Sequence, residues 1–327
     1  MRSWILSSLV VVLALNAPAR AIDPKYLPAD AEAVITINLK AMLESDLAKS
    51  KKELVEKVKE QIRSKLADSP VKEYLDKAGF DLLRDLHTIT VASNGSKDKD
   101  KLFIAIEGNF NTDKLIDAAQ DAARDNGDAL KLSKIANVQV FEISPKGGDE
   151  QTVYASVLNG HVLIAAPSRE VLGATIGRAN GARTTVRASL RALLDTTNSK
   201  QALSIVFTGT GIANAMSDAP IPPQAGEQLQ GIDGLSVGLT VAKDISFQVA
   251  ATSKDEDSAK KLSGMANLGL LGIRGMIQKK AQDDQKAQLV LEVANTLRVT
   301  QQGTTVSLRG EISQENFDRI LALLPKR

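Results

Sequence analysis

The sequence contains no cysteine. The chain can therefore form no disulfide bond, offer no thiolate to a metal and carry no lipid anchor on a cysteine. Aromatic residues make up only 3% of the chain, and its one tryptophan is Trp4. Aromatic platforms for sugars and aromatic interface anchors are thus scarce. We expect the fold to be stabilised by burial of apolar side chains alone, which a chain of 327 residues can supply.

Histidine is nearly absent as well. His87 and His161 are the whole inventory, and no H-x-x-x-H spacing exists, so the sequence predicts no zinc site and no cofactor. Asp98 and Asp100 lie in a polar loop that lacks the calcium-loop pattern. A weak surface cation site there is the alternative.

The N-terminus predicts a cleaved leader over residues 1–21. A short positive start precedes an apolar run at 5–15, which is too short to span a bilayer. Small residues Ala19 and Ala21 then place the cut between Ala21 and Ile22. We expect an exported protein, periplasmic or extracellular. No later run reaches 18 apolar residues, so no transmembrane segment is expected after cleavage.

The charge balance argues against nucleic acid as a partner. The chain has 41 basic and 39 acidic residues. Removal of the leader takes away Arg2 and Arg20, which leaves equal numbers of each sign. A general nucleic-acid or anionic-surface role therefore gains no support from net charge.

The architecture is organised around a strand–strand–helix unit at residues 86–126. Alternating apolar residues predict both strands, and Asn111 or Thr112 caps the helix. The same order returns from Leu235, where Ser253 and Glu256 form a capping box for the helix. A strand predicted at 34–39, with alternating Ile35 and Ile37, precedes the first copy, and one at 202–208 precedes the second. Hairpins about Asn159-Gly160 and 302–303 complete the two copies.

This order predicts an α+β fold with an internal duplication. We expect a first half over residues 22–186 and a second half over 187–327, each an antiparallel sheet with helices packed on one face. The strand predicted at 138–143 has no clear counterpart in the second half. Coincidental similarity within one irregular α+β domain is the alternative.

A glycine-rich segment at 262–277 is the candidate interaction helix. Its only charge is Arg274, and its glycines are Gly264, Gly269, Gly272 and Gly275. Small residues permit another element or a lipid surface to approach closely. The alternative is a central helix packed between the two halves.

A second segment, at 49–65, is rich in lysine. It could present a basic face to an acidic polymer or headgroup. A solvated face, with Glu53 paired to Lys57, is the alternative.

Three short patterns resemble catalytic or cofactor motifs, and none has the required context. Residues 234–238 read G-x-S-x-G, but Ser236 lies inside a strand and both histidines precede it. Residues 209–211 read G-T-G without the third glycine of a dinucleotide loop. Ser69 and Ser258 each begin S-x-x-K, without partner motifs. No catalytic residue is predicted.

Three stretches carry a resemblance to a known group of proteins. They are the residues after the leader, Tyr26-Leu27-Pro28-Ala29-Asp30, then Ala78-Gly79-Phe80-Asp81, and the strand at 102–110. Together they resemble uncharacterised secreted proteins of planctomycete-type bacteria, over most of the mature chain. The resemblance implies export and a bacterial source, and it implies no activity.

Our leading hypothesis is an exported, soluble, non-enzymatic binding or scaffold protein of the bacterial envelope, with its ligand or partner unidentified. One alternative is a hydrolase that uses carboxylates or a Ser/Lys pair. Another is a carrier of an apolar ligand held between sheet and helices.

Overall fold

The computed structural model describes residues 22–67, 71–95, 102–126, 129–144, 151–182, 185–216, 231–282 and 284–323. Within these residues the chain forms a 12-stranded sheet in which all neighbouring strands are antiparallel. In spatial order the strands are β11 (Arg298–Gln302), β12 (Thr305–Ile312), β10 (Ile245–Ser253), β9 (Ile232–Val241), β8 (Leu203–Thr208), β1 (Ala33–Asn38), β2 (Leu86–Ser93), β3 (Phe103–Gly108), β7 (Val162–Ala166), β6 (Val153–Leu158), β5 (Val138–Ile143) and β4 (Leu130–Ile135).

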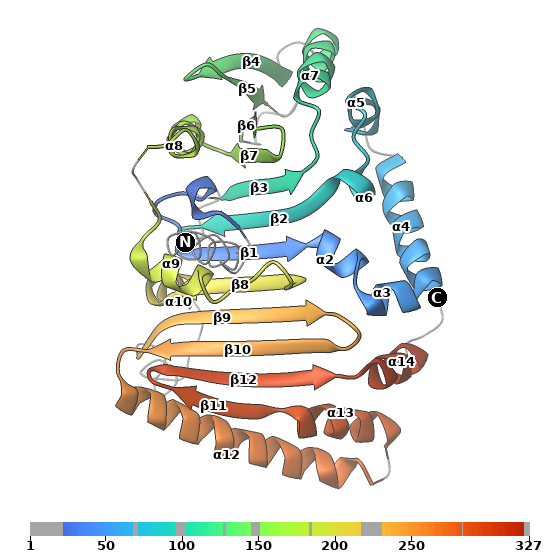
Figure 1. Ribbon diagram of the computed structural model, residues 1–327, viewed down its shortest axis with the longest axis vertical. Helices are drawn as coiled ribbons and strands as arrows, with labels where there is room; N and C mark the ends of the chain where they lie inside the picture. Colours follow the sequence, from blue (N-terminus) through green and yellow to red (C-terminus); the bar gives the residue numbers. More distant parts are fainter. Residues whose placement is uncertain are drawn as a thin grey trace, which may run out of the picture.

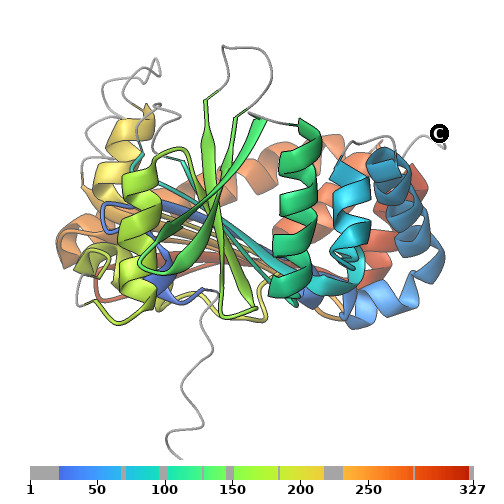
Figure 2. The same ribbon diagram turned by 90° about the horizontal axis from the view of Figure 1, so that it is seen from above.

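The helices are η1 (Pro24–Tyr26), α2 (Leu39–Leu43), α3 (Asp46–Ser50), α4 (Lys52–Ala67), α5 (Val71–Lys77), α6 (Leu82–Asp85), α7 (Thr112–Asn126), α8 (Arg169–Ala179), α9 (Ala188–Leu194), α10 (Gly209–Met216), α12 (Glu256–Lys280), α13 (Gln285–Thr296) and α14 (Gln314–Leu323). In Figure 1 the helices α2, α3 and α14 lie beyond the strand ends, and α12 lies along one outer edge of the sheet. Figure 2 shows the strong twist of the sheet between its two ends.

The hairpin turns follow from local backbone preferences. Asn159 and Gly160 have φ of 55° and 67°, as a two-residue type I′ turn requires, so the predicted β6–β7 hairpin is confirmed. Strand β5 is confirmed with the predicted bounds. Strand β4 was not predicted. It pairs with β5 through a turn at Ala136 and Asn137, whose φ angles are 48° and 65°.

The predicted α+β class is confirmed, with one continuous sheet instead of two. Strands β1 and β8 pair at its centre. Outward from β1 the order is β2, β3, β7, β6, and outward from β8 it is β9, β10, β12, β11. Strands β5 and β4 extend the first side only. This correspondence concerns strand order, and duplication of the chain stays a prediction.

The prediction that helices pack on one face of each sheet is wrong. Val162 and Ile164 of β7 belong to a core that also contains Leu172 of α8. The intervening Leu163 packs on the other side, in a core with Leu115 of α7. Because successive strand residues point to opposite faces, helices cover both faces at the β7–β4 end.

A buried carboxylate also joins residues 22–186 to residues 187–327. Glu32, just before β1, is 3% exposed and accepts hydrogen bonds from the side chains of Arg187 and Thr208. The backbone N–H of Thr208 donates to the carbonyl of Glu32 at 2.9 Å. These bonds satisfy a charge that would be costly to bury alone.

Helix α12 differs from its prediction in two respects. Its N-cap is Asp255, whose side chain accepts from the N–H of Ser258, because Ser253 still belongs to β10. The alternative interpretation, a central helix packed between the two halves, is wrong. The helix lies along the β11 edge of the sheet (Figure 1).

Candidate functional site

One face of the six central strands is apolar, and no helix of the described residues covers its middle. Directly paired residues on antiparallel strands share a face, so the register defines two rows across β10, β9, β8, β1, β2 and β3. We call these twelve side chains the open face. They are Val249, Val237, Ile205, Ile35, Val91 and Ile104 in one row, and Phe247, Leu239, Leu203, Ile37, Ile89 and Ile106 in the other.

None of the twelve side chains is buried. Ile35 and Ile37, at the centre, are 36% and 37% exposed. No described helix crosses the middle of β9, β8, β1 and β2 in Figure 1. Contiguous exposed apolar surface of this kind marks interaction sites in soluble proteins.

The opposite face of the same strands is covered, and it combines small and polar side chains with the apolar core residues Val34, Phe103 and Val206. Thr36, Thr90 and Ser204 are 3%, 0% and 4% exposed. The hydroxyls of Thr36 and Thr90 lie 3.2 Å apart and form a hydrogen bond. Helix α9 packs there, with Leu193 so close to Gly234 that an added Cβ would lie 2.7 Å from it. Apolar side chains therefore lie on both faces of these strands, and the covered face buries threonine and serine hydroxyls as well.

Helices stand at both ends of the open face. Ile104 and Ile106 pair with Ala165 and Leu163, which α7 covers. At the far end, Leu297 at the end of α13 lies over β12, where a Cβ on Gly310 would come within 2.6 Å of Leu297 and 2.5 Å of Phe247. The apolar surface is therefore bounded by helical walls at both ends.

A polar pocket of about 470 Å³ lies where β1 ends and β2 begins. Its lining comes from α2, α4, α6 and the two strand ends. The residues are Lys40, Leu43, Glu44, Lys59, Arg63, Asp81, Leu83, Arg84, Leu86, His87 and Asn109. Lys40 follows Ile37 by three residues, and His87 precedes Ile89 by two, so the pocket adjoins the strands that carry the open face.

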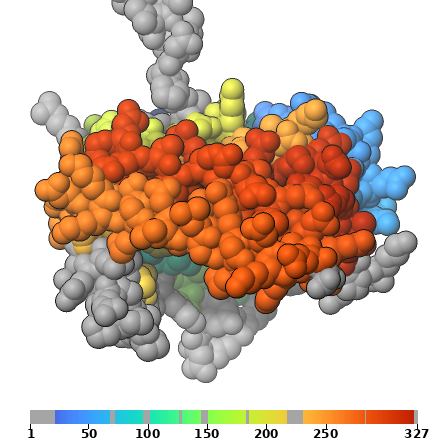
Figure 3. All heavy atoms as spheres, turned by 90° about the horizontal axis from the view of Figure 1, so that it is seen from below, coloured from blue at the N-terminus to red at the C-terminus, as the bar shows by residue number. Residues whose placement is uncertain are grey.

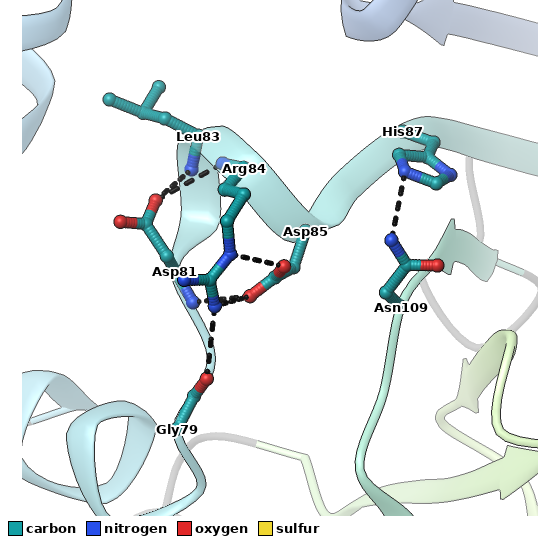
Figure 4. Close-up of polar contacts among 7 residues, drawn as sticks. All are labelled: Gly79, Asp81, Leu83, Arg84, Asp85, His87 and Asn109. Atoms are coloured by element: carbon teal, nitrogen blue, oxygen red, sulfur yellow. Dashed lines mark hydrogen bonds and ion pairs between the residues drawn. The ribbon is translucent and has the colours of Figure 1, made fainter.

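The short helix α6 builds one wall of this pocket (Figure 4). The side chain of Asp81 accepts from the N–H groups of Leu83 and Arg84 at 2.9 and 3.1 Å and so caps the helix. Arg84 donates to both oxygens of Asp85, at 2.7 and 2.6 Å. This bidentate pair, helped by the N–H of Asp81, lowers the pKa of Asp85.

Some of the remaining polar side chains of the pocket have partners and others do not. Lys59 pairs with Glu56 at 2.7 Å, and His87 lies 3.5 Å from the amide of Asn109. Within the described residues, Lys40 and Arg63 make no side-chain hydrogen bond or ion pair. The pocket thus offers free cations beside the carboxylates Glu44 and Asp81, an arrangement suited to a small charged group.

The predicted interaction helix lies apart from this site. A Cβ added to Gly264, Gly269, Gly272 or Gly275 would meet nothing within 4 Å, so no part of the described fold requires these glycines. Arg274 has a structural role. Its guanidinium donates to the carbonyls of Ala294 and Leu297 at 3.0 and 2.7 Å, which joins α12 to the end of α13.

Two motif-like patterns have packing explanations. Ser236 lies within β9, followed by another strand, which is not the turn that a nucleophile requires. A Cβ on Gly209 or Gly211 would lie 2.8 or 2.5 Å from a backbone oxygen, so close packing of α10 demands these glycines.

Of the two serines in S-x-x-K patterns, the structure describes only Ser258. The hydroxyl of Ser258 donates to Asp255 at 3.1 Å, within the α12 cap. Ser69 lies outside the described residues, and Lys72 pairs with Asp76 at 2.5 Å. The lysine-rich segment became α4, with Glu56–Lys59 in place of the expected Glu53–Lys57 pair.

Sequence reasoning identified the strands of the open face and missed its exposure. Alternation at Ile35 and Ile37 predicts a strand with one apolar face, and the same pattern results whether or not a helix covers that face. The predicted leader cleavage lies between Ala21 and Ile22. Ala21 lies outside the described residues, and Ile22 packs in the core with 2% exposure.

Two searches of the described residues bear on the site. No group of three or more His, Asp or Glu side chains there is placed to hold a metal ion. Among the helices of those residues, none combines the length and the apolar character needed to cross a membrane.

The fold and the site define an α+β protein built on one antiparallel sheet, with an open apolar face and an adjoining polar pocket. Residues 4–268 match the family described as "Protein of unknown function (DUF3352)", and the chain belongs to that family. Neither the curated proteins nor the solved structures contain a match to the chain.

Proposed function

We propose that this chain is an exported, non-enzymatic binding protein of the bacterial envelope that carries an apolar ligand on the open face. The observation that carries the proposal is the exposure of Ile35 and Ile37 at the centre of an apolar face that continues over the neighbouring strands. A fold stabilised by apolar burial gains nothing from leaving these residues uncovered, so an external molecule is the natural cover.

The shape of the surroundings favours a slender ligand over a flat protein partner. Helices α7 and α13 stand on the open face at its two ends. A second sheet would meet these walls before it reached Ile35 and Ile37, whereas a hydrocarbon chain could lie along the rows between them. The scaffold alternative would need a partner with a protruding apolar element.

The expected affinity is moderate. Full burial of an exposed Ile, Leu or Phe side chain is worth roughly 1.5–3 kcal/mol, and side chains already about two-thirds covered would add roughly 0.5 kcal/mol each. Twelve of them give on the order of 6 kcal/mol, or a Kd of roughly 10–100 μM before the cost of immobilising the ligand.

The proposal is tested by titrating the protein with a fluorescent apolar probe and displacing the probe with hexadecanol. The variant Ile35→Glu with Ile37→Glu places two charges in the middle of the open face and should abolish binding. Val58→Glu on α4, where the wild-type side chain is 47% exposed, is the matched control and should bind normally. Equal binding by both variants would sink the proposal.

A second candidate function is recognition of a small charged molecule in the polar pocket. Lys40 and Arg63 favour it, because among the residues that the structure describes they make no side-chain hydrogen bond or ion pair. Lys40→Gln with Arg63→Gln should then weaken binding of a carboxylate such as hexadecanoate relative to hexadecanol, which tests the pocket separately from the open face. We assign no described residue a catalytic role, and we do not propose the hydrolase alternative.

We also propose that the two sides of the sheet arose by duplication, with halves at 22–186 and 187–327. The matching outward strand order supports this origin. Export rests on the leader pattern at residues 1–21, and a bacterial, planctomycete-type source rests on the resemblance alone. N-terminal sequencing of the protein from its host should return Ile22 as the first residue, and retention of Met1 would end the export proposal.

A further inference from the structure

The outer side of α12 is a second exposed apolar surface, separate from the open face. Leu268, Leu271 and Met276 are 71%, 62% and 64% exposed, and Met265 is 40% exposed. Figure 3 shows the orange atoms of α12 running across the underside of the molecule. The buried side of the helix, which includes Ala259 and Leu270, already packs on the fold. Leu268, Leu271 and Met276 therefore leave most of their surface exposed.

The charges around this surface have one sign. From Ser258 to Lys280 the helix contains five basic residues and no acidic residue. Arg274 is taken up by backbone carbonyls. The remaining lysines form two pairs that flank the apolar stretch, Lys260 with Lys261 and Lys279 with Lys280, and all four are exposed. Acidic residues of the helix occur only in the first turn, at Glu256 and Asp257, where Asp257 pairs with Lys260 at 3.4 Å.

We propose that α12 docks on an anionic lipid surface, lying in the plane of the interface. Exposed leucine and methionine on one side, with lysines at the margins, are the features of an interfacial helix. Between Lys261 and Lys279 the helix extends about 27 Å, at about 1.5 Å per residue. Apolar side chains would enter the headgroup boundary while the lysines extend to lipid phosphates.

The charges favour lipid over a second copy of the chain. Lys261 and Lys279 are five helical turns apart, so they lie on one stripe with Leu268 between them. An antiparallel pair of α12 helices meeting on this stripe would bring Lys261 of one copy to Lys279 of the other. A parallel pair would set each lysine against itself. Like charges oppose both arrangements, whereas an anionic surface attracts the lysines at both ends of the helix.

The glycines fit the same surface. Four glycines in an exposed helix cost roughly 1 kcal/mol each relative to alanine. A Cβ at any of them would meet nothing, so the described fold gains nothing from them. Without Cβ atoms the backbone can approach the headgroups more closely, and the long Leu268 and Met276 side chains can reach deeper.

The experiment is co-flotation of the full chain with vesicles of phosphatidylcholine, with and without about one-third phosphatidylglycerol. We expect binding to the anionic vesicles only. Raising ionic strength from about 0.05 M to about 0.5 M should reduce it strongly. Lys279→Glu with Lys280→Glu should weaken it by at least roughly 30-fold, at about 1 kcal/mol per lysine. Leu268→Asp with Met276→Asp should abolish it.

Matched variants on α4 provide the controls. Leu54 and Val58 are 39% and 47% exposed, so Leu54→Asp with Val58→Asp should leave vesicle binding unchanged, as should Lys52→Glu with Lys57→Glu. Thermal unfolding of each variant shows that it is folded. Absence of binding to anionic vesicles, or equal loss with the α4 variants, would overturn the proposal. Dimers in light scattering that Leu268→Asp dissolves, without vesicle binding, would assign this surface to a second copy.

Discussion

The two faces of the central sheet differ in how far their side chains are buried. Thr36 and Thr90 are buried on one face, while Ile35 and Ile37 are exposed on the other. All four residues belong to the paired strands β1 and β2. The covered face is held by helices and by hydroxyl hydrogen bonds. The open face contributes little to stability and is available for binding. The comparison teaches that composition alone does not decide which face of a sheet becomes the core; the positions of the helices decide it.

Core truncation should show the largest difference between the faces. Leu172 of α8 is 0% exposed and belongs to the core on the covered face. We expect Leu172→Ala to lower the free energy of unfolding by roughly 2–5 kcal/mol, because a cavity remains. Ile37→Ala on the open face should cost only about 1 kcal/mol, mostly from cross-strand contacts. Urea unfolding of both variants measures the difference, and similar losses would contradict the comparison.

The hydroxyl pair on the covered face should show an intermediate effect. Thr90→Val removes one partner and leaves the buried hydroxyl of Thr36 without its bond at 3.2 Å. We expect a loss of about 1–2 kcal/mol in the free energy of unfolding. The double variant with Thr36→Val should recover to within about 0.5 kcal/mol of the wild type. Additive losses in this cycle would show that the two hydroxyls are not coupled.

Glu107 should give the covered face a pH dependence. Burial raises the pKa of this carboxyl, while the hydrogen bond from Thr88 opposes the change and Asp23 adds to it. Because the folded pKa lies above the unfolded value, folding is favoured most when Glu107 is protonated, and this contribution is lost as pH rises through the folded pKa.

Glu107→Gln should therefore be more stable than the wild type at neutral pH, with the difference shrinking as pH falls below the ordinary glutamate pKa. Thermal unfolding across pH measures this effect, which we expect to be smaller than the hydroxyl effect. Glu53→Gln on α4 is the control for loss of one exposed carboxylate. A variant that loses stability at neutral pH would contradict the assignment.

Much of the fold could be predicted because its signals are local. Asn159-Gly160 supplies the left-handed backbone of a type I′ turn, and the alternation of Ile35 and Ile37 specifies a strand. Strand β4 was missed because Ala136 and Asn137 form an equivalent turn without a glycine. The helices on both faces depend on tertiary packing, which strand periodicity does not encode.

The candidate site was less accessible to prediction. Its polar pocket combines Lys40, Arg63, His87 and Asn109, which are distant in the chain and meet only in the folded protein. The lysine-rich segment drew attention to α4, two of whose residues do line the pocket. The sequence does not indicate that the apolar side of β1 is exposed, because the positions of the covering helices depend on tertiary packing.

The most direct test of the central claim is photolabelling with an alkyl diazirine, followed by mapping of the modified residues by mass spectrometry. A hydrocarbon bound on the open face should label β1, β2, β8 and β9 at open-face side chains such as Ile35, Ile37 and Ile205. Excess hexadecanol should suppress that labelling, and the variant Ile35→Glu with Ile37→Glu should lack it. Labels confined to α12, or spread evenly over exposed side chains without competition, would contradict the account.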